Sequence, residues 1–146
     1  MLVATHMAAA AALYRLSSVR SLPRPARWGA MPAVLALCFA SHFALDAIPH
    51  RELQMPGNTM LGLLVIAYLL YIAWRDGDIL LLAAGFLGAL PDVMWVLDVS
   101  SSFNQFHSSL HFNGVRVPFY ILFVELAGLL ALTVIIHLKS GLRREC

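Results

Sequence analysis

The densest group of chemically active side chains in the sequence lies in residues 41–50. Asp46 follows His42 by four positions, and His50 follows Asp46 by four more. Positions i and i+4 of an α-helix share a face, so an imidazole and a carboxylate at this spacing can bind one ion. Such ligands suit zinc, with manganese or iron as alternatives. The spacing predicts a divalent-metal site, and leaves open that His42 and Asp46 only hydrogen-bond to each other or to water.

Further candidate ligands are spread along the chain. His107 and His111 form a second i, i+4 pair, Asp92 follows a proline, and His6 lies near the N-terminus. An ionised carboxylate in an apolar segment costs several kcal/mol unless it is paired or bound to a metal. The predicted set of metal ligands is therefore His6, His42, Asp46, His50, Asp92, His107 and His111.

Two other carboxylates are candidates for the catalytic role of a general base that orients a water molecule. They are Asp98 and Glu125, which the hydropathy pattern places toward the same side of the membrane as the ligands. Each has a structural alternative. Asp98 would equally serve as a helix cap, and Glu125 as a buried partner for Arg116.

The elements that must position these residues are membrane helices. Only 18 of 146 residues are charged and 60% are hydrophobic, whereas about 25% of the residues in a soluble domain are charged. The apolar blocks approach the roughly 20 residues that cross a bilayer. We predict one all-α domain, a polytopic integral membrane bundle of four to five transmembrane helices over residues 1–146. The expected helices are approximately 2–19, 32–48, 59–74, 79–97 and 118–138, with a polar outer loop at 99–117.

The first expected helix has competing interpretations. Residues 2–19 are apolar and rich in alanine, and the first acidic residue of the chain is Asp46. A signal peptide carries its positive charge before the apolar run, and here the arginines come after it. An organellar presequence is the other alternative. We favour a first membrane helix.

The basic residues predict the orientation. With five crossings, eight of the ten lysines and arginines fall on one side, and only Arg51 and Arg116 fall on the other. The positive-inside rule then places the C-terminus in the cytoplasm and the candidate ligands at the outer surface. Because the cations are segregated by the helices, they form no continuous patch for phosphates, and we expect no nucleic-acid binding.

Two side-chain patterns concern packing. Ala84, Gly85, Gly88 and Ala89 repeat small residues at a spacing of four, which favours close approach by another helix, although small residues scattered in an alanine-rich chain would look similar. The three tryptophans fall near expected helix ends, as an interfacial belt would require: Trp28, Trp74 and Trp95.

The motifs together resemble the bacterial membrane-bound metal-dependent hydrolase family. The segments concerned are Thr5-His6, His42-x-x-x-Asp46-x-x-Pro49-His50, Gly88-Ala89-Leu90-Pro91-Asp92 and His107-x-x-x-His111. Met94 and Trp95 stand where the family usually has Asp and His. The resemblance implies hydrolysis in a bacterial inner membrane. A site at the interface favours a substrate presented by the lipid bilayer, such as a lipid-linked phosphoester. The alternative is a non-catalytic, metal-stabilised membrane scaffold or partner-binding protein.

Overall fold

The structure, a computed structural model, describes residues 2–51, 53–110 and 117–141. These residues form helices and connecting segments, with no strand among them, which confirms the all-α prediction. The elements are α1 (Val3–Leu16), the short 3-10 helix η1 (Val19–Ser21), α2 (Arg24–Asp46), α3 (Met55–Asp76), α4 (Ile79–Val96), α5 (Ser101–Leu110) and α6 (Tyr120–Gly141).

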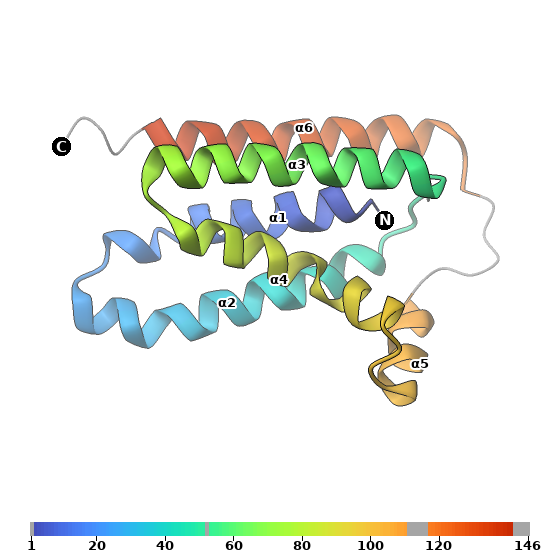
Figure 1. Cartoon of the computed structure of the whole chain (residues 1–146), viewed down its shortest axis with the longest axis horizontal. Helices are drawn as coiled ribbons and strands as arrows, with labels where there is room; N and C mark the ends of the chain where they lie inside the picture. The colour runs from blue at the N-terminus through green and yellow to red at the C-terminus, as the bar shows by residue number, and fades with distance from the viewer. Residues whose placement is uncertain (1, 52, 111–116, 142–146) are drawn as a thin grey trace.

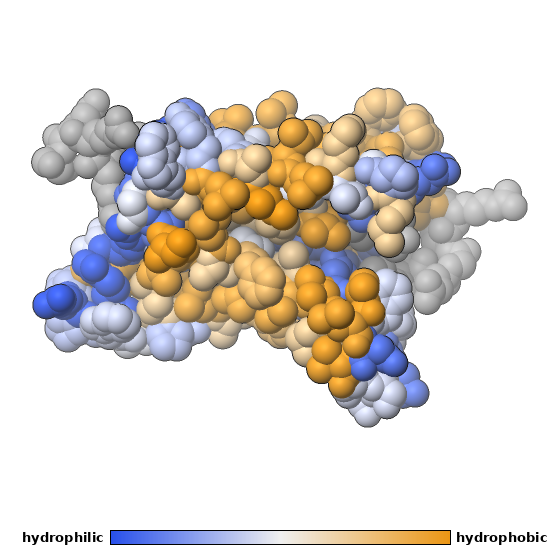
Figure 2. Space-filling model, viewed as in Figure 1, coloured by the Kyte–Doolittle hydropathy of each residue, from blue (hydrophilic) through white to orange (hydrophobic). Residues whose placement is uncertain are grey.

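Four of the helices are long and apolar enough to cross a membrane: α2, α3, α4 and the Tyr120–Lys139 part of α6. Their outer faces carry large apolar side chains, such as Leu63, Phe86 and Leu130, which are 61%, 54% and 65% exposed. Hydrophobic residues gather over the middle of the molecule and hydrophilic residues toward its ends (Figure 2). Such a surface needs hydrocarbon around it. The chain is therefore an integral membrane protein.

The short helix α1 is the centre of the bundle. It packs against α2, α3, α4 and α6 and lies between them in Figure 1. The alanine run Ala8–Ala12 is at most 9% exposed. Small side chains allow several helices to approach one axis closely. At about 1.5 Å per residue, α1 spans about 21 Å, less than the ~30 Å hydrocarbon layer. The predicted helix 2–19 is thus shorter than expected and forms the core of the bundle.

The contact between α1 and α4 depends on glycine. A Cβ atom at Gly88 would clash with the carbonyl oxygen of His6 and with the side chain of Ala10. At Gly85 it would lie 2.7 Å from the side chain of Leu69. The prediction of a close helix contact along this face is confirmed.

Two helices begin earlier than predicted. The helix expected at 32–48 starts at Arg24, because Pro23 and Pro25 lie at its N-terminus, where a missing N–H is tolerated. The helix expected at 59–74 starts at Met55. Asn58 therefore lies inside α3, and its Oδ1 accepts a hydrogen bond of 3.1 Å from the Val3 N–H at the start of α1.

The expected loop at 99–117 is wrong over most of its described part, since residues 101–110 form the helix α5. Phe103, Phe106, His107 and Leu110 follow the i, i+3, i+4, i+7 spacing of one helical face. The polar composition concealed a short amphipathic helix. It projects beyond the end of α4 (Figure 1).

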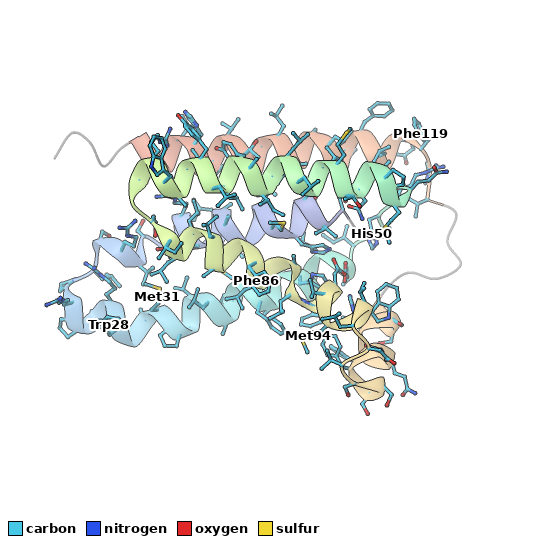
Figure 3. All side chains as sticks on the ribbon, in the orientation of Figure 1. Trp28, Met31, His50, Phe86, Met94 and Phe119 are labelled. Atoms are coloured by element: carbon cyan, nitrogen blue, oxygen red, sulfur yellow. The ribbon has the colours of Figure 1, made fainter. Side chains whose placement is uncertain are left out.

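The bundle has two chemically different ends. We call the end formed by the start of α1, the ends of α2 and α4, and α5 the histidine end. The opposite end, with η1, the α3–α4 turn and the end of α6, is the arginine end. In Figure 3, His50 and Phe119 lie at the histidine end, and Trp28 and Met31 toward the arginine end. Trp28 and Trp74 are 74% and 82% exposed, as expected of interfacial side chains.

Candidate metal centre

Four potential metal ligands from three helices converge at the histidine end. His42 and Asp46 come from α2, Asp92 from α4 and His107 from α5. One ligand atom from each lies within 4.8 Å of the other three. His42 and Asp46 are fully buried and His107 is 1% exposed. The structure thus brings together four of the seven predicted ligands in a group that can hold a metal ion.

The spacing of the ligand atoms fits one small ion. Asp46 Oδ2 lies 3.0 Å from His42 Nε2 and 3.0 Å from His107 Nε2, and the two nitrogens are 3.1 Å apart. Asp92 Oδ1 is farther, at 3.5 Å from His42 Nε2 and 3.7 Å from His107 Nε2. In a tetrahedral zinc site with bonds of about 2.0–2.1 Å, neighbouring ligand atoms lie about 3.3 Å apart. The observed distances bracket that value.

A backbone contact orients His42. Its Nδ1–H donates a hydrogen bond of 2.8 Å to the carbonyl oxygen of Gly88. This contact leaves the lone pair of Nε2 directed at the cluster, as a metal-ligating imidazole requires. Gly88 permits it because α4 can approach α1 and α2 closely at that point. The sequence pattern identified the packing role of Gly88 but gave no indication of its contact with His42.

His6 supports the cluster from α1. Its Nε2 lies 3.1 Å from Asp46 Oδ1, the oxygen that faces away from His107. Its ring stacks on that of His42, with centroids 3.9 Å apart. His6 is fully buried. This arrangement places His6, which the sequence predicted as an outlying ligand, beside the four-residue group and next to Asp46.

Aromatic side chains surround His107. Trp95 and Phe103 each have ring centroids 5.8 Å from its imidazole, and Phe43 lies 6.2 Å away. These rings exclude water from the ligand nitrogen and restrict its rotation. The position of Trp95 near a helix end predicted only an interfacial residue. Its position one turn after Asp92 is a signal that would have placed it near the site.

The cluster is open on one side. The side chain of Asp92 is 22% exposed, while those of His42 and Asp46 are fully buried. Asp92 is also the most distant of the four from its neighbours. The centre therefore combines three closely spaced, buried ligands with a fourth carboxylate at an accessible edge.

His50 lies outside this group. The helix α2 ends at Asp46, so the i+4 relation does not continue to residue 50. The imidazole instead donates from Nδ1 to the carbonyl oxygen of Ile48 at 2.8 Å. Its side chain lines a groove beside Thr5 and Glu125. His111 lies outside the described residues.

The two predicted general bases make structural contacts. Asp98 lies in the turn before α5, is exposed and has a φ of 50°. Its Oδ1 accepts a hydrogen bond of 2.6 Å from the side-chain amide of Asn104 in α5. Glu125 is 8% exposed, and its Oε1 accepts a 2.7 Å hydrogen bond from the Leu2 N–H. A carboxylate at a helix N-terminus stabilises that helix. Glu125 thus caps the start of α1, whereas Asp98 binds the side chain of Asn104 across the α4–α5 turn.

The arginine end holds a different polar cluster. The oxygens of Asp76 meet Arg15 at 2.6 Å and Arg75 at 3.0 Å. Those of Asp78 meet Arg20 at 2.6 Å and the Tyr14 hydroxyl at 3.0 Å. Burial and the neighbouring Asp78 charge raise the pKa of Tyr14, which keeps its hydroxyl protonated and donating. These partners of the two carboxylates are arginine and tyrosine groups, all of which are donors.

Comparisons with protein-family models, with curated proteins and with solved structures found no match to this chain. The geometry of the site is therefore the guide to what this chain does.

Proposed function

We propose that this chain is a membrane-embedded metal-dependent hydrolase with one divalent ion, zinc in the first instance, at the histidine end. The observation that supports it is the convergence of His42, Asp46 and His107 within 3.1 Å of one another beside an accessible carboxylate. Catalytic zinc sites typically have three protein ligands and one open position. A metal there would supply Lewis acidity toward a phosphoester or ester bond.

The residues have separate roles in this proposal. His42, Asp46 and His107 hold the ion, and Gly88 and His6 keep His42 and Asp46 in position through the contacts described above. Asp92, at the open edge, accepts a proton from the attacking water. Asp98 and Glu125 were the predicted bases, but Asp98 binds the Asn104 side chain outside the cluster and Glu125 binds the Leu2 N–H, so Asp92 is favoured for this role. A lipid-linked phosphoester is the proposed substrate because the site lies at the end of membrane-spanning helices.

A second candidate is a non-catalytic scaffold stabilised by the metal. It is favoured by the same four residues if Asp92 also binds the ion, because four protein ligands typically close a structural site. The absence of Asp and His at positions 94 and 95, where the family it resembles has them, points the same way. The two candidates share the metal and differ in what Asp92 does.

Metal analysis of the protein purified in nanodiscs tests both candidates. We expect one zinc, manganese or iron ion per chain in the wild type and less than a tenth of that in Asp46→Asn. Asp98→Asn is the matched control, since Asp98 is exposed and outside the cluster, and it should retain the metal. Equal metal content in the wild type and Asp46→Asn would refute the proposed centre.

Turnover separates the hydrolase from the scaffold. The metal-loaded wild type should hydrolyse members of a panel of phosphoester and ester lipids. Asp92→Asn should retain the ion and lose about 100-fold to 10,000-fold in turnover, as removal of a general base typically does. Bound metal without turnover in the wild type would support the scaffold.

We also propose a bacterial inner membrane, with the arginine end in the cytoplasm and the histidine end outside. The support is the gathering of basic residues at the arginine end, where Arg15, Arg20 and Lys139 line one hollow. A reporter that is active only in the cytoplasm should be active when it is fused after Cys146, and a reporter that is active only outside should be inactive there. An external signal would reverse the orientation.

A further inference from the structure

An apolar groove lies between the end of α2 and the first half of α6, beside the metal centre. Its volume is about 410 Å³. Leu45 and Ile48 form one wall, Val124 and Gly128 form the other, and Thr5 of α1 lies between them. A Cβ atom built on Gly128 meets nothing within 4 Å, so the space beside α6 is open. The volume falls in the range of sites that hold small molecules.

The surroundings of the groove indicate what fills it. Ile48 and Val124, on opposite walls, are 52% and 62% exposed and apolar, and they belong to the surface that faces the bilayer. Water in such a space would find almost no polar partners. The material in contact with this surface in a membrane is lipid hydrocarbon, so an acyl chain is the occupant that matches the groove.

Thr5 and Glu125 line the groove without making it polar. The two residues are only 5% and 8% exposed, and Thr5 Oγ1 and Glu125 Oε2 are buried atoms that present almost no surface to the groove. The accessible wall is therefore apolar, as contact with an acyl chain requires.

We propose that this groove binds one acyl chain of a bilayer lipid, with the head region of that lipid toward His50. Thr5 and Leu45 of the groove are followed directly by His6 and Asp46 of the metal centre, so the two sites share the walls of α1 and α2. His50 marks the histidine end of the groove (Figure 3). That this lipid is also the substrate rests on the proposed function, whereas binding of the chain does not.

Photo-crosslinking in nanodiscs tests the proposal. The probe is phosphatidylglycerol, whose head group carries hydroxyls, with a diazirine at the end of one acyl chain. We expect several-fold more labelling of residues 121–132 of α6 than of the exposed side chains of Leu63, Ile66 and Leu70 on α3. Gly128→Trp fills the groove and should reduce this ratio to unity.

The control is Ala127→Trp, which adds the same bulk to an exposed neighbouring position that does not line the groove. It should leave the ratio unchanged. If Gly128→Trp does not fold, Ala131→Phe fills the same groove and should have the same effect. Equal labelling of α3 and α6 in the wild type, or an unchanged ratio in the filled variants, would overturn the proposal. The proposal would also be overturned if the wild type were a dimer and Gly128→Trp a monomer with unchanged labelling. A second copy of the chain would then occupy the groove.

The same measurement on Asp46→Asn separates this proposal from the proposed function. Labelling should persist in this variant, because the groove walls do not need the ion. Labelling without bound metal in the wild type would support the lipid site and refute the metal centre. Bound metal without preferential labelling of α6 would support the metal centre and refute the lipid site.

Discussion

The two ends of the bundle neutralise buried carboxylates in different ways. At the arginine end, Asp76 and Asp78 meet guanidinium groups and the Tyr14 hydroxyl, which are donors at any physiological pH. At the histidine end, the described ion pairs of Asp46 and Asp92 are with histidines. An imidazole carries a full positive charge only at acidic pH. The first cluster contains its own permanent cations, while the second has ligand atoms in place for a cation.

This difference indicates which buried polar groups are structural and which are functional. Perturbed ionisable groups in a membrane are functional candidates by default, yet the arginine end shows that burial alone is not sufficient. The distinguishing property is the type of partner. Arginine partners hold a helix end in place. Histidine partners at 3.0–3.1 Å from the carboxylate can lose a proton and bind a metal ion with the same nitrogen.

The largest expected effect is at the arginine end. Arg15→Met leaves Asp76 and Asp78 buried without their central cation and should lower the free energy of unfolding by about 3–5 kcal/mol. Denaturant titration in mixed micelles measures it. Arg24→Met is the control, because Arg24 is exposed, and its effect should stay within about 0.5 kcal/mol. Equal effects of the two variants would remove the contrast between the ends.

Metal addition should stabilise the histidine end selectively. Zinc at about 100 times its dissociation constant should raise the free energy of unfolding by about 2.7 kcal/mol, and chelation should reverse the gain. Asp46→Asn should show no response. Tyr14→Phe, at the other end, should respond as the wild type does, within about 0.5 kcal/mol, since distant sites are additive. A zinc response that persists in Asp46→Asn would contradict the assignment of the site.

A smaller effect should come from the helix contact that supports the centre. Gly88→Ala introduces a Cβ atom against His6 and Ala10 and should cost about 1–3 kcal/mol of stability. The carbonyl oxygen of residue 88 also accepts the hydrogen bond that orients His42. The clash moves this carbonyl group, so metal affinity should fall by about 10-fold to 100-fold. Gly62→Ala is the control, since its Cβ meets nothing within 4 Å. Loss of stability without loss of affinity would show that Gly88 acts through packing alone.

The smallest effect should be that of Tyr14→Phe, which removes one hydrogen bond to Asp78 at 3.0 Å. A hydrogen bond to a charged group contributes about 1.5 kcal/mol, and we expect that loss in the unfolding titration with no change in metal content. Tyr120→Phe, at an exposed tyrosine, should have no measurable effect. A change in metal content for Tyr14→Phe would mean that the two ends are coupled.

Much of the fold was predictable from hydropathy and from local spacing. The apolar blocks predicted the membrane helices, and the i, i+4 relation predicted that His42 and Asp46 act together. Helix starts were less predictable. Clustered prolines looked like a loop, but Pro23 and Pro25 lie at the start of α2, where proline is tolerated, and Pro32 lies inside that helix.

The rest of the site depends on packing that one sequence does not reveal. His107 reaches the cluster only because α5 forms within a polar segment, where Phe103 of the same helix packs against His107 and Phe106 packs against Phe43. Glu125 and Asn58 both face the start of α1, and their capping contacts connect residues far apart in the chain. Spacing rules apply within one helix and cannot show such contacts.

The central position of α1 has a consequence for assembly in the membrane. This helix precedes in the sequence the helices that surround it, and its partners include Asn58, Asp76, Gly88 and Glu125. It is too short to span the hydrocarbon layer alone, so its position in the membrane depends on the helices that follow it. The step that encloses α1 is also the step that brings His6 to Asp46. Because His107 comes from α5, the four ligands can meet only after α5 has been synthesised.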